Sequence, residues 1–262
     1  MMKNKSDKYM AKARSSVKLL VGAVVKEIVS LAKRYRDSGK DFQFSSFPEL
    51  DRAVDDLLVK LSDDVLADTL EKMRLALEEA DMDVEYGNVA QEVQDDDRFG
   101  MLPIERIDSH ASHLKWFIEG ALAVSFVYGI ADRFIPTYIM RYMENPVFWK
   151  EWREAMREGQ EYAATIIQEG GPHYGRGVQR DPVGGMTLTE ETMISEGYQR
   201  GVLMGYMSAG AIGYRVHRGS DYDCPSCDEL CVGVHPLSEV VLPNHPRCKC
   251  WTTPVFNTDD IE

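Results

Sequence analysis

The sequence has no cysteine before position 224, and all 5 of its cysteines lie between Cys224 and Cys250. This distribution excludes a disulfide framework that holds the whole chain together. Long apolar runs are also missing, because the uncharged stretches at residues 120–131 and 201–214 are shorter than the roughly 18 residues of a membrane span. The apolar residues near the start run into charged ones without a signal-peptide cleavage site. We therefore expect a chain made in a reducing cytoplasm, without membrane contact, whose cysteine cluster needs a local explanation.

Positive charge is scarce as well: 30 Lys and Arg residues against 43 Asp and Glu residues leave a net charge of −13 at pH 7. A chain this acidic is a poor general DNA binder, because neutralisation of phosphates drives such binding. The charge is unevenly divided, since residues 1–40 carry 11 Lys or Arg and 3 Asp or Glu, whereas residues 41–100 carry 5 and 18. The basic segment is either an arm for DNA or another acidic surface, or one of two solvated helix faces that attract each other.

Alternating strand patterns are absent before residue 212, and most of the chain has apolar residues at helical spacing. The predicted helices cover residues 17–35, 50–77, 104–131 and 149–167. Acidic residues replace this periodicity at 81–98, which predicts a linker or mobile loop. The Gly- and Pro-rich residues 170–185 predict a flexible connector.

A further helix is predicted after the connector, where Thr187 and Glu190 have the spacing of a capping box. Within it, small residues recur at every fourth position, at Gly197, Gly201, Gly205, Ala209 and Gly213. Residues four apart share a helix face, so these form a stripe almost free of side chains. Each interior glycine costs about 0.5–1 kcal/mol of helix propensity relative to alanine. The stripe therefore predicts close packing against another helix backbone, in this chain or in a partner.

The C-terminal cysteines form two short groups with the spacing of metal ligands. Cys224 and Cys227 make a C-x2-C pair, and His245, Cys248 and Cys250 follow further along. Zinc takes four tetrahedral nitrogen or sulfur ligands in structural sites. The predicted zinc ligands are Cys224, Cys227, His245 and Cys250, with Cys248 as the alternative fourth ligand. The other interpretations are reduced thiols that merely pack, or disulfides that form after release to oxidising conditions.

The fold class that follows is mainly α, with a helical body and a small C-terminal α+β module stapled by zinc. We divide the chain into three regions. They are an N-terminal helical region with the acidic linker (1–100), central helices with the Gly-rich connector (101–186), and the C-terminal module (187–262).

The module resembles the C-terminal signature of Mu F-like phage head morphogenesis proteins, which are minor head proteins of tailed phages and prophages. The resemblance rests on Asp221-x-x-Cys224-x-x-Cys227, on Leu230 and Gly233, and on Pro243-x-His245-Pro246-x-Cys248-Lys249-Cys250. It covers residues 187–256. Lys249 stands where the family usually has arginine, and residues 215–218 stand where it often has a strand containing tryptophan.

The resemblance implies a structural protein, not an enzyme, inside the capsid or at the portal vertex of a virion assembled in the bacterial cytoplasm. The implied partners are the portal protein and other head proteins, and the implied role is in procapsid assembly and DNA packaging or delivery. From charge alone, we add a DNA contact through basic residues 1–40. We expect no small-molecule substrate.

The alternative is a zinc-stapled nucleic-acid or regulatory binding module, although residues 214–256 are near neutral instead of basic. A zinc or thiol enzyme is less expected. The sequence has no His-Glu-x-x-His motif and no His-x-Glu before the Cys224 pair. Cys231 with His235 is the remaining candidate for a nucleophile and its base.

Overall fold

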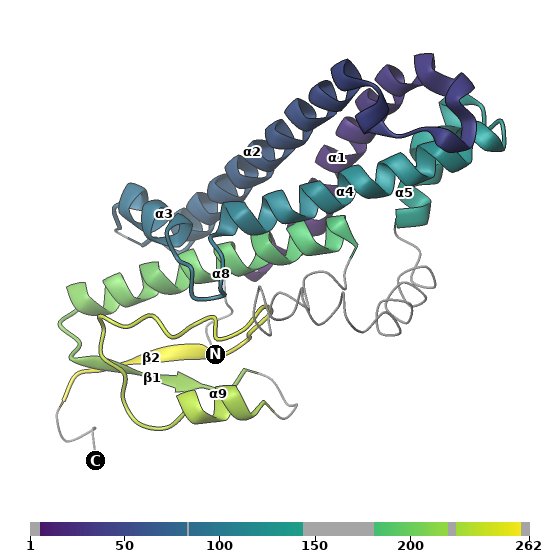
Figure 1. The fold of residues 1–262 in the computed structure, drawn as a ribbon. Coiled ribbons are helices and arrows are strands. Elements are labelled where there is room, and N and C mark those ends of the chain that lie inside the picture. Colours follow the sequence, from purple (N-terminus) through teal and green to yellow (C-terminus); the bar gives the residue numbers. More distant parts are fainter. Residues whose placement is uncertain (1–5, 83, 144–180, 220–223, 258–262) are drawn as a thin grey trace. The chain divides into compact units, whose positions relative to one another are not determined.

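The structure is a computed structural model that describes residues 6–82, 84–143, 181–219 and 224–257 (Figure 1). The predicted helix at 149–167 and most of the predicted connector lie outside those residues, as do Asp221 and Asp223. The α-helices and 3₁₀-helices (η) of the described residues are α1 (Asp7–Ala32), η1 (Lys33–Asp41), η2 (Phe44–Ser46), α2 (Pro48–Glu79), α3 (Tyr86–Gln94), α4 (Pro103–Val127), η3 (Asp132–Phe134), α5 (Ile135–Met143), α8 (Pro182–Ser208) and α9 (Pro225–Leu230). The strands are β1 (Gly213–His217) and β2 (Trp251–Val255).

The chain forms two compact units, each assembled from separate stretches of sequence. Unit 1 comprises residues 1–13, 67–95 and 188–262, and unit 2 comprises residues 14–66 and 96–187. The predicted mainly α architecture is confirmed, because helices predominate and the one small sheet of the described residues lies near the C-terminus. None of the described helices is both long enough and apolar enough to cross a membrane.

Unit 2 is a set of helices whose apolar faces share one core. The helices predicted at 17–35, 50–77 and 104–131 are confirmed as α1, α2 and α4, which are the long ribbons labelled in Figure 1. Their periodic apolar residues point inward, as at Ile28, Leu61 and Leu114, which are fully buried. Proline occupies the first turn of both α2 and α4, where its missing N–H is not needed.

The acidic stretch 81–98 is not wholly a linker, so this prediction is wrong in part. Residues 86–94 form α3, which buries Val89, Ala90 and Val93. The Tyr86 hydroxyl donates to the Leu70 carbonyl of α2 (2.7 Å). Three apolar residues on a helix of little more than two turns are too few for periodicity to reveal, and contacts within unit 1 supply the remaining stabilisation.

The start of α8 also differs from the prediction. Asp181 accepts a hydrogen bond from the Gly184 N–H (2.7 Å), and Pro182 fills the first helical position. Gly184 and Gly185 therefore belong to the helix and not to the connector. Thr187 donates to the Val183 carbonyl (2.6 Å) within the helix, so the predicted capping box is wrong.

The predicted glycine stripe is confirmed at two of its positions. A Cβ at Gly197 would lie 1.9 Å from the Met73 sulfur, and one at Gly201 would lie 2.4 Å from Leu77 Cδ2. The stripe thus receives side chains of α2, not a helix backbone. At Gly205 a Cβ would meet nothing within 4 Å, and Gly213 belongs to β1, so the stripe ends before the helix does.

Gly197→Ala is expected to lower the free energy of unfolding by about 1–3 kcal/mol, because the new methyl group overlaps Met73. Gly205→Ala is the matched control in the same helix. It is expected to raise the free energy of unfolding by about 0.5–1 kcal/mol, since the site is open and alanine favours the helix. Urea unfolding followed by circular dichroism measures both changes. Equal effects of the two substitutions would contradict the assigned contact.

The two strands of the C-terminal module of unit 1 pair with each other and hold the ends of the module together. β1 and β2 are antiparallel, with Gly213 opposite Val255 and His217 opposite Trp251. The hydroxyl of buried Tyr214 donates to the Glu239 carbonyl (2.6 Å) and fixes the long connection between the strands. That connection carries every predicted metal ligand.

Candidate metal centre

The first pair of predicted ligands is positioned by the short helix α9. Cys224 is the residue that precedes its first turn, and Pro225 begins the helix. The Cys227 and Asp228 N–H groups both donate to the Cys224 carbonyl (2.9 and 3.0 Å). This turn places the two cysteines of the C-x2-C pair at one end of the helix, where both thiols face the same side.

The second group comes from the loop that leads into β2. The Cys248 N–H donates to the His245 carbonyl (3.0 Å), which closes a tight turn, and Arg247 within it has a φ of 63°. The Arg247 Nε donates to Glu191 Oε2 of α8 (2.8 Å) and anchors the turn. Cys250 directly precedes β2, so the sheet fixes its position.

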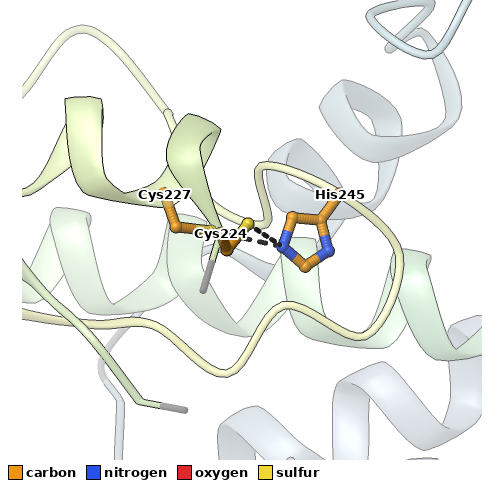
Figure 2. A group of neighbouring side chains, drawn as sticks. All are labelled: Cys224, Cys227 and His245. Carbon is orange, nitrogen blue, oxygen red and sulfur yellow. Dashed lines mark hydrogen bonds between the residues drawn. The ribbon is translucent and has the colours of Figure 1, made fainter. Parts of the chain in front are cut away.

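The two groups meet around the imidazole of His245. Its Nε2 lies 3.4 Å from Cys224 Sγ and 3.2 Å from Cys227 Sγ, as Figure 2 shows. The His245 Nδ1 lies 3.0 Å from the Pro246 carbonyl oxygen, which only accepts. In the neutral imidazole, Nδ1 therefore carries the proton and Nε2 presents its lone pair to the thiols, as in a metal-binding histidine.

All five predicted ligand residues come together in two overlapping groups. One contains Cys224, Cys227 and His245, and the other contains Cys227, Cys248 and Cys250. Within each group the ligand atoms lie within 4.8 Å of one another. Cys227 belongs to both groups. Because Cys248 and Cys250 are both buried beside it, the choice between them as the fourth ligand stays a prediction.

One pair of sulfur donors has the separation expected around a zinc ion. With Zn–S bonds of about 2.3 Å, neighbouring sulfurs in a tetrahedral site lie about 3.8 Å apart. The Cys227 and Cys248 sulfurs are 3.9 Å apart. None of the five described cysteines is in a disulfide. The cluster is therefore a set of sulfur and nitrogen donors that could hold a metal ion.

The thiols differ in how readily they ionise. The Ser226 hydroxyl, followed by the Cys227 N–H, lowers the pKa of Cys224 to about 7. Burial raises the pKa of Cys227 and of Cys250, and the neighbouring Cys248 adds to both shifts. Buried thiolates side by side are unfavourable without a cation, and a bound metal ion removes this penalty by accepting their charge.

Several supporting contacts leave no signal in the sequence. The Asn244 amide lies 3.9 Å from Cys227 Sγ, where its N–H group donates to sulfur. A Cβ at Gly219 would lie 1.7 Å from the Lys249 carbonyl oxygen, so only glycine fits beside this turn. Neither position has a spacing that identifies it, because both contacts depend on how the loop folds back.

The remaining candidates in the module lie outside the cluster. Cys231 belongs to neither group of ligand atoms, and burial raises the pKa of its thiol. The His235 ring is hydrogen-bonded to the Leu230 carbonyl (2.8 Å). A nucleophilic cysteine needs the opposite shift, toward thiolate.

The ligand residues are part of the small core of the module. Cys227, Cys248 and Cys250 are buried together with Leu203, Tyr214, Val216 and Leu242. A metal ion held there would replace much of the apolar core that a segment of this size lacks. Comparison of the chain with protein-family models, with curated proteins and with solved structures gives no match.

Proposed function

We propose that this chain is a minor head protein of a tailed phage or prophage, and that its C-terminal module is stapled by a structural zinc ion. In this proposal the protein docks at the portal vertex and supports procapsid assembly and DNA packaging or delivery. The observation that carries it is the meeting of the two halves of the signature, Cys224–Cys227 and His245–Cys250, in one cluster.

The burial of the cluster supports a structural role for the ion in preference to a catalytic one. A catalytic zinc keeps an open position for water and has a base beside it. Here Cys227, Cys248 and Cys250 are buried in the core of the module, and five donors compete for four positions. The surroundings of the cluster do not favour a DNA-reading finger, since Arg218 pairs with Asp228 and Arg247 with Glu191.

The test is co-expression of the tagged chain with the portal protein encoded in the same phage or prophage genome. We expect the two to elute together as a portal-sized oligomer, and we expect the chain in assembled particles by mass spectrometry. Cys231→Ser, which alters a thiol outside the cluster, should leave the association intact. A chain that elutes alone and is missing from particles would refute the head function.

A further inference from the structure

One end of unit 2 is built by two segments that lie far apart in sequence. Arg36 of η1 pairs with Asp132 of η3, and its Nη2 donates to the Ile130 carbonyl (2.5 Å). The rings of Phe42 and Phe126 pack edge to face, with centroids 5.1 Å apart. The chain between α1 and α2 therefore lies beside the end of α4 and the start of α5 (Figure 1).

Four exposed cations gather on these segments: Lys33, Arg34 and Lys40 of η1, and Arg133 of η3. Within the part of the chain that the structure describes, none of the four is paired with a carboxylate. Three carboxylates share the segments, those of Asp37, Asp41 and Asp132, and Asp132 is taken by Arg36. A chain with a net charge of −13 thus carries a local excess of positive charge here.

Two exposed aromatic side chains come from η3 and from the end of α4 just before it. The Tyr128 side chain at the end of α4 is 78% exposed, and that of Phe134 in η3 is 55% exposed. The Arg133 guanidinium lies 4.6 Å from the centroid of the Phe134 ring. Exposed rings beside unpaired cations are what a nucleic-acid strand with accessible bases requires, because phosphates meet the charges and bases stack on the rings.

We propose that this surface, defined by Lys33, Arg34, Lys40, Tyr128, Arg133 and Phe134 and called the η1–η3 surface, binds nucleic acid, with preference for single strands. The inference goes beyond the proposed head function, because it is argued from the exposed charges and rings of this surface alone. Within residues 1–40, it also restricts the expected DNA contact to Lys33, Arg34 and Lys40. Much of that segment is core, since Val17, Val21 and Ile28 of α1 are fully buried.

The burial of α1 determines how the surface is tested. Deleting residues 1–40 would remove core side chains, so loss of binding after deletion would say nothing about contact. Substitution of exposed cations keeps the core intact. The pair Lys33→Gln and Lys40→Gln probes the surface, and the pair Lys12→Gln and Lys60→Gln makes the same change in charge at exposed positions elsewhere.

The probe is a labelled oligothymidylate of about 30 nucleotides, longer than the roughly 4–16 nucleotides of a typical single-strand site. Its binding to the full chain is followed by fluorescence anisotropy at several salt concentrations. We expect the Lys33/Lys40 variant to bind about tenfold more weakly and its log–log salt slope to be shallower by about 1.4. The Lys12/Lys60 control should bind within about twofold of the unmodified chain, since it touches no proposed phosphate contact.

The exposed rings of the η1–η3 surface are tested separately. Tyr128→Ala is expected to weaken oligothymidylate binding about tenfold, whereas Phe256→Ala, at an exposed ring outside the surface, should not. Absence of binding, or equal losses in the Lys33/Lys40 and Lys12/Lys60 variants, would overturn the proposal. Tighter binding to a duplex of equal length would overturn the single-strand preference. None of these measurements involves the portal, so their results do not depend on whether the head function is correct.

Discussion

Replacing Cys227 by serine is expected to abolish stoichiometric zinc binding and to unfold the C-terminal module, whereas Cys231→Ser leaves both unchanged. Cys227 is the residue that both groups of ligand atoms share, so its loss breaks either choice of four ligands. In zinc-finger peptides the apparent free energy of zinc binding is about 10–16 kcal/mol, and it is folding free energy.

The measurement combines elemental analysis of the purified full chain with limited proteolysis between β1 and β2. One zinc per chain and a protected module are expected for the unmodified protein and for Cys231→Ser. A chelator should expose the module to protease in both. If the unmodified chain contained no zinc, or if Cys227→Ser still bound one zinc per chain, the site would be refuted.

Comparing Cys248→Ser with Cys250→Ser then identifies the fourth ligand, since only one of the two variants should lose the metal.

Lys72→Met is expected to lower the free energy of unfolding by about 1–3 kcal/mol at pH 7, because the buried Glu190 carboxyl loses its hydrogen-bond donor and must take up a proton to avoid an unpaired buried charge. The Lys72 Nζ of α2 lies 2.5 Å from Glu190 Oε1 of α8, and the Glu190 side chain is fully buried. Asp68 also pairs with Lys72, but the Asp68 side chain is 31% exposed. Asp68→Asn is therefore the control, with an expected cost of less than about 1 kcal/mol. Similar costs for the two variants would contradict the assignment.

The same pair predicts a dependence of stability on pH. Burial raises the pKa of Glu190 from its ordinary value of 4.5 to about 7, although Lys72 opposes this shift. The folded chain therefore holds a proton that the unfolded chain releases between these two values. This contribution to stability is fully present below pH 4.5 and is lost as the pH rises through about 7. Glu190→Gln should remove this part of the pH dependence in thermal unfolding measured from pH 5 to 8, and an unchanged profile would contradict it.

The long helices are predictable from the sequence because they are stabilised by burying apolar residues that recur at helical spacing. Val17, Val21 and Ile28 recur on one face of α1 and are all buried. The Lys72–Glu190 pair has no such signature, because its partners are 118 residues apart and meet only after folding. Gly184 and Gly185 differ from the prediction for a related reason. Their composition suggests a loop, but the cap at Asp181 determines where α8 begins.

The residues of the candidate metal centre stand out in the sequence by their type and spacing. Metal ligands must be particular residue types at short spacings, so Cys224, Cys227 and His245 are identifiable from the sequence alone. What the spacing does not supply is the support around them. The Arg247–Glu191 pair and the Asn244 contact depend on how a long loop returns to α8 and α9.

The strand pair of the module affects any ion that its loop holds. β1 and β2 bring the ends of this loop together, so they raise the effective concentration of each ligand group at the other. Linkage makes the benefit mutual: an ion that joins Cys227 to His245 must stabilise the pairing of His217 with Trp251 by the same free energy. A substitution such as Val216→Ala, in a strand and not at a ligand, should therefore weaken metal affinity.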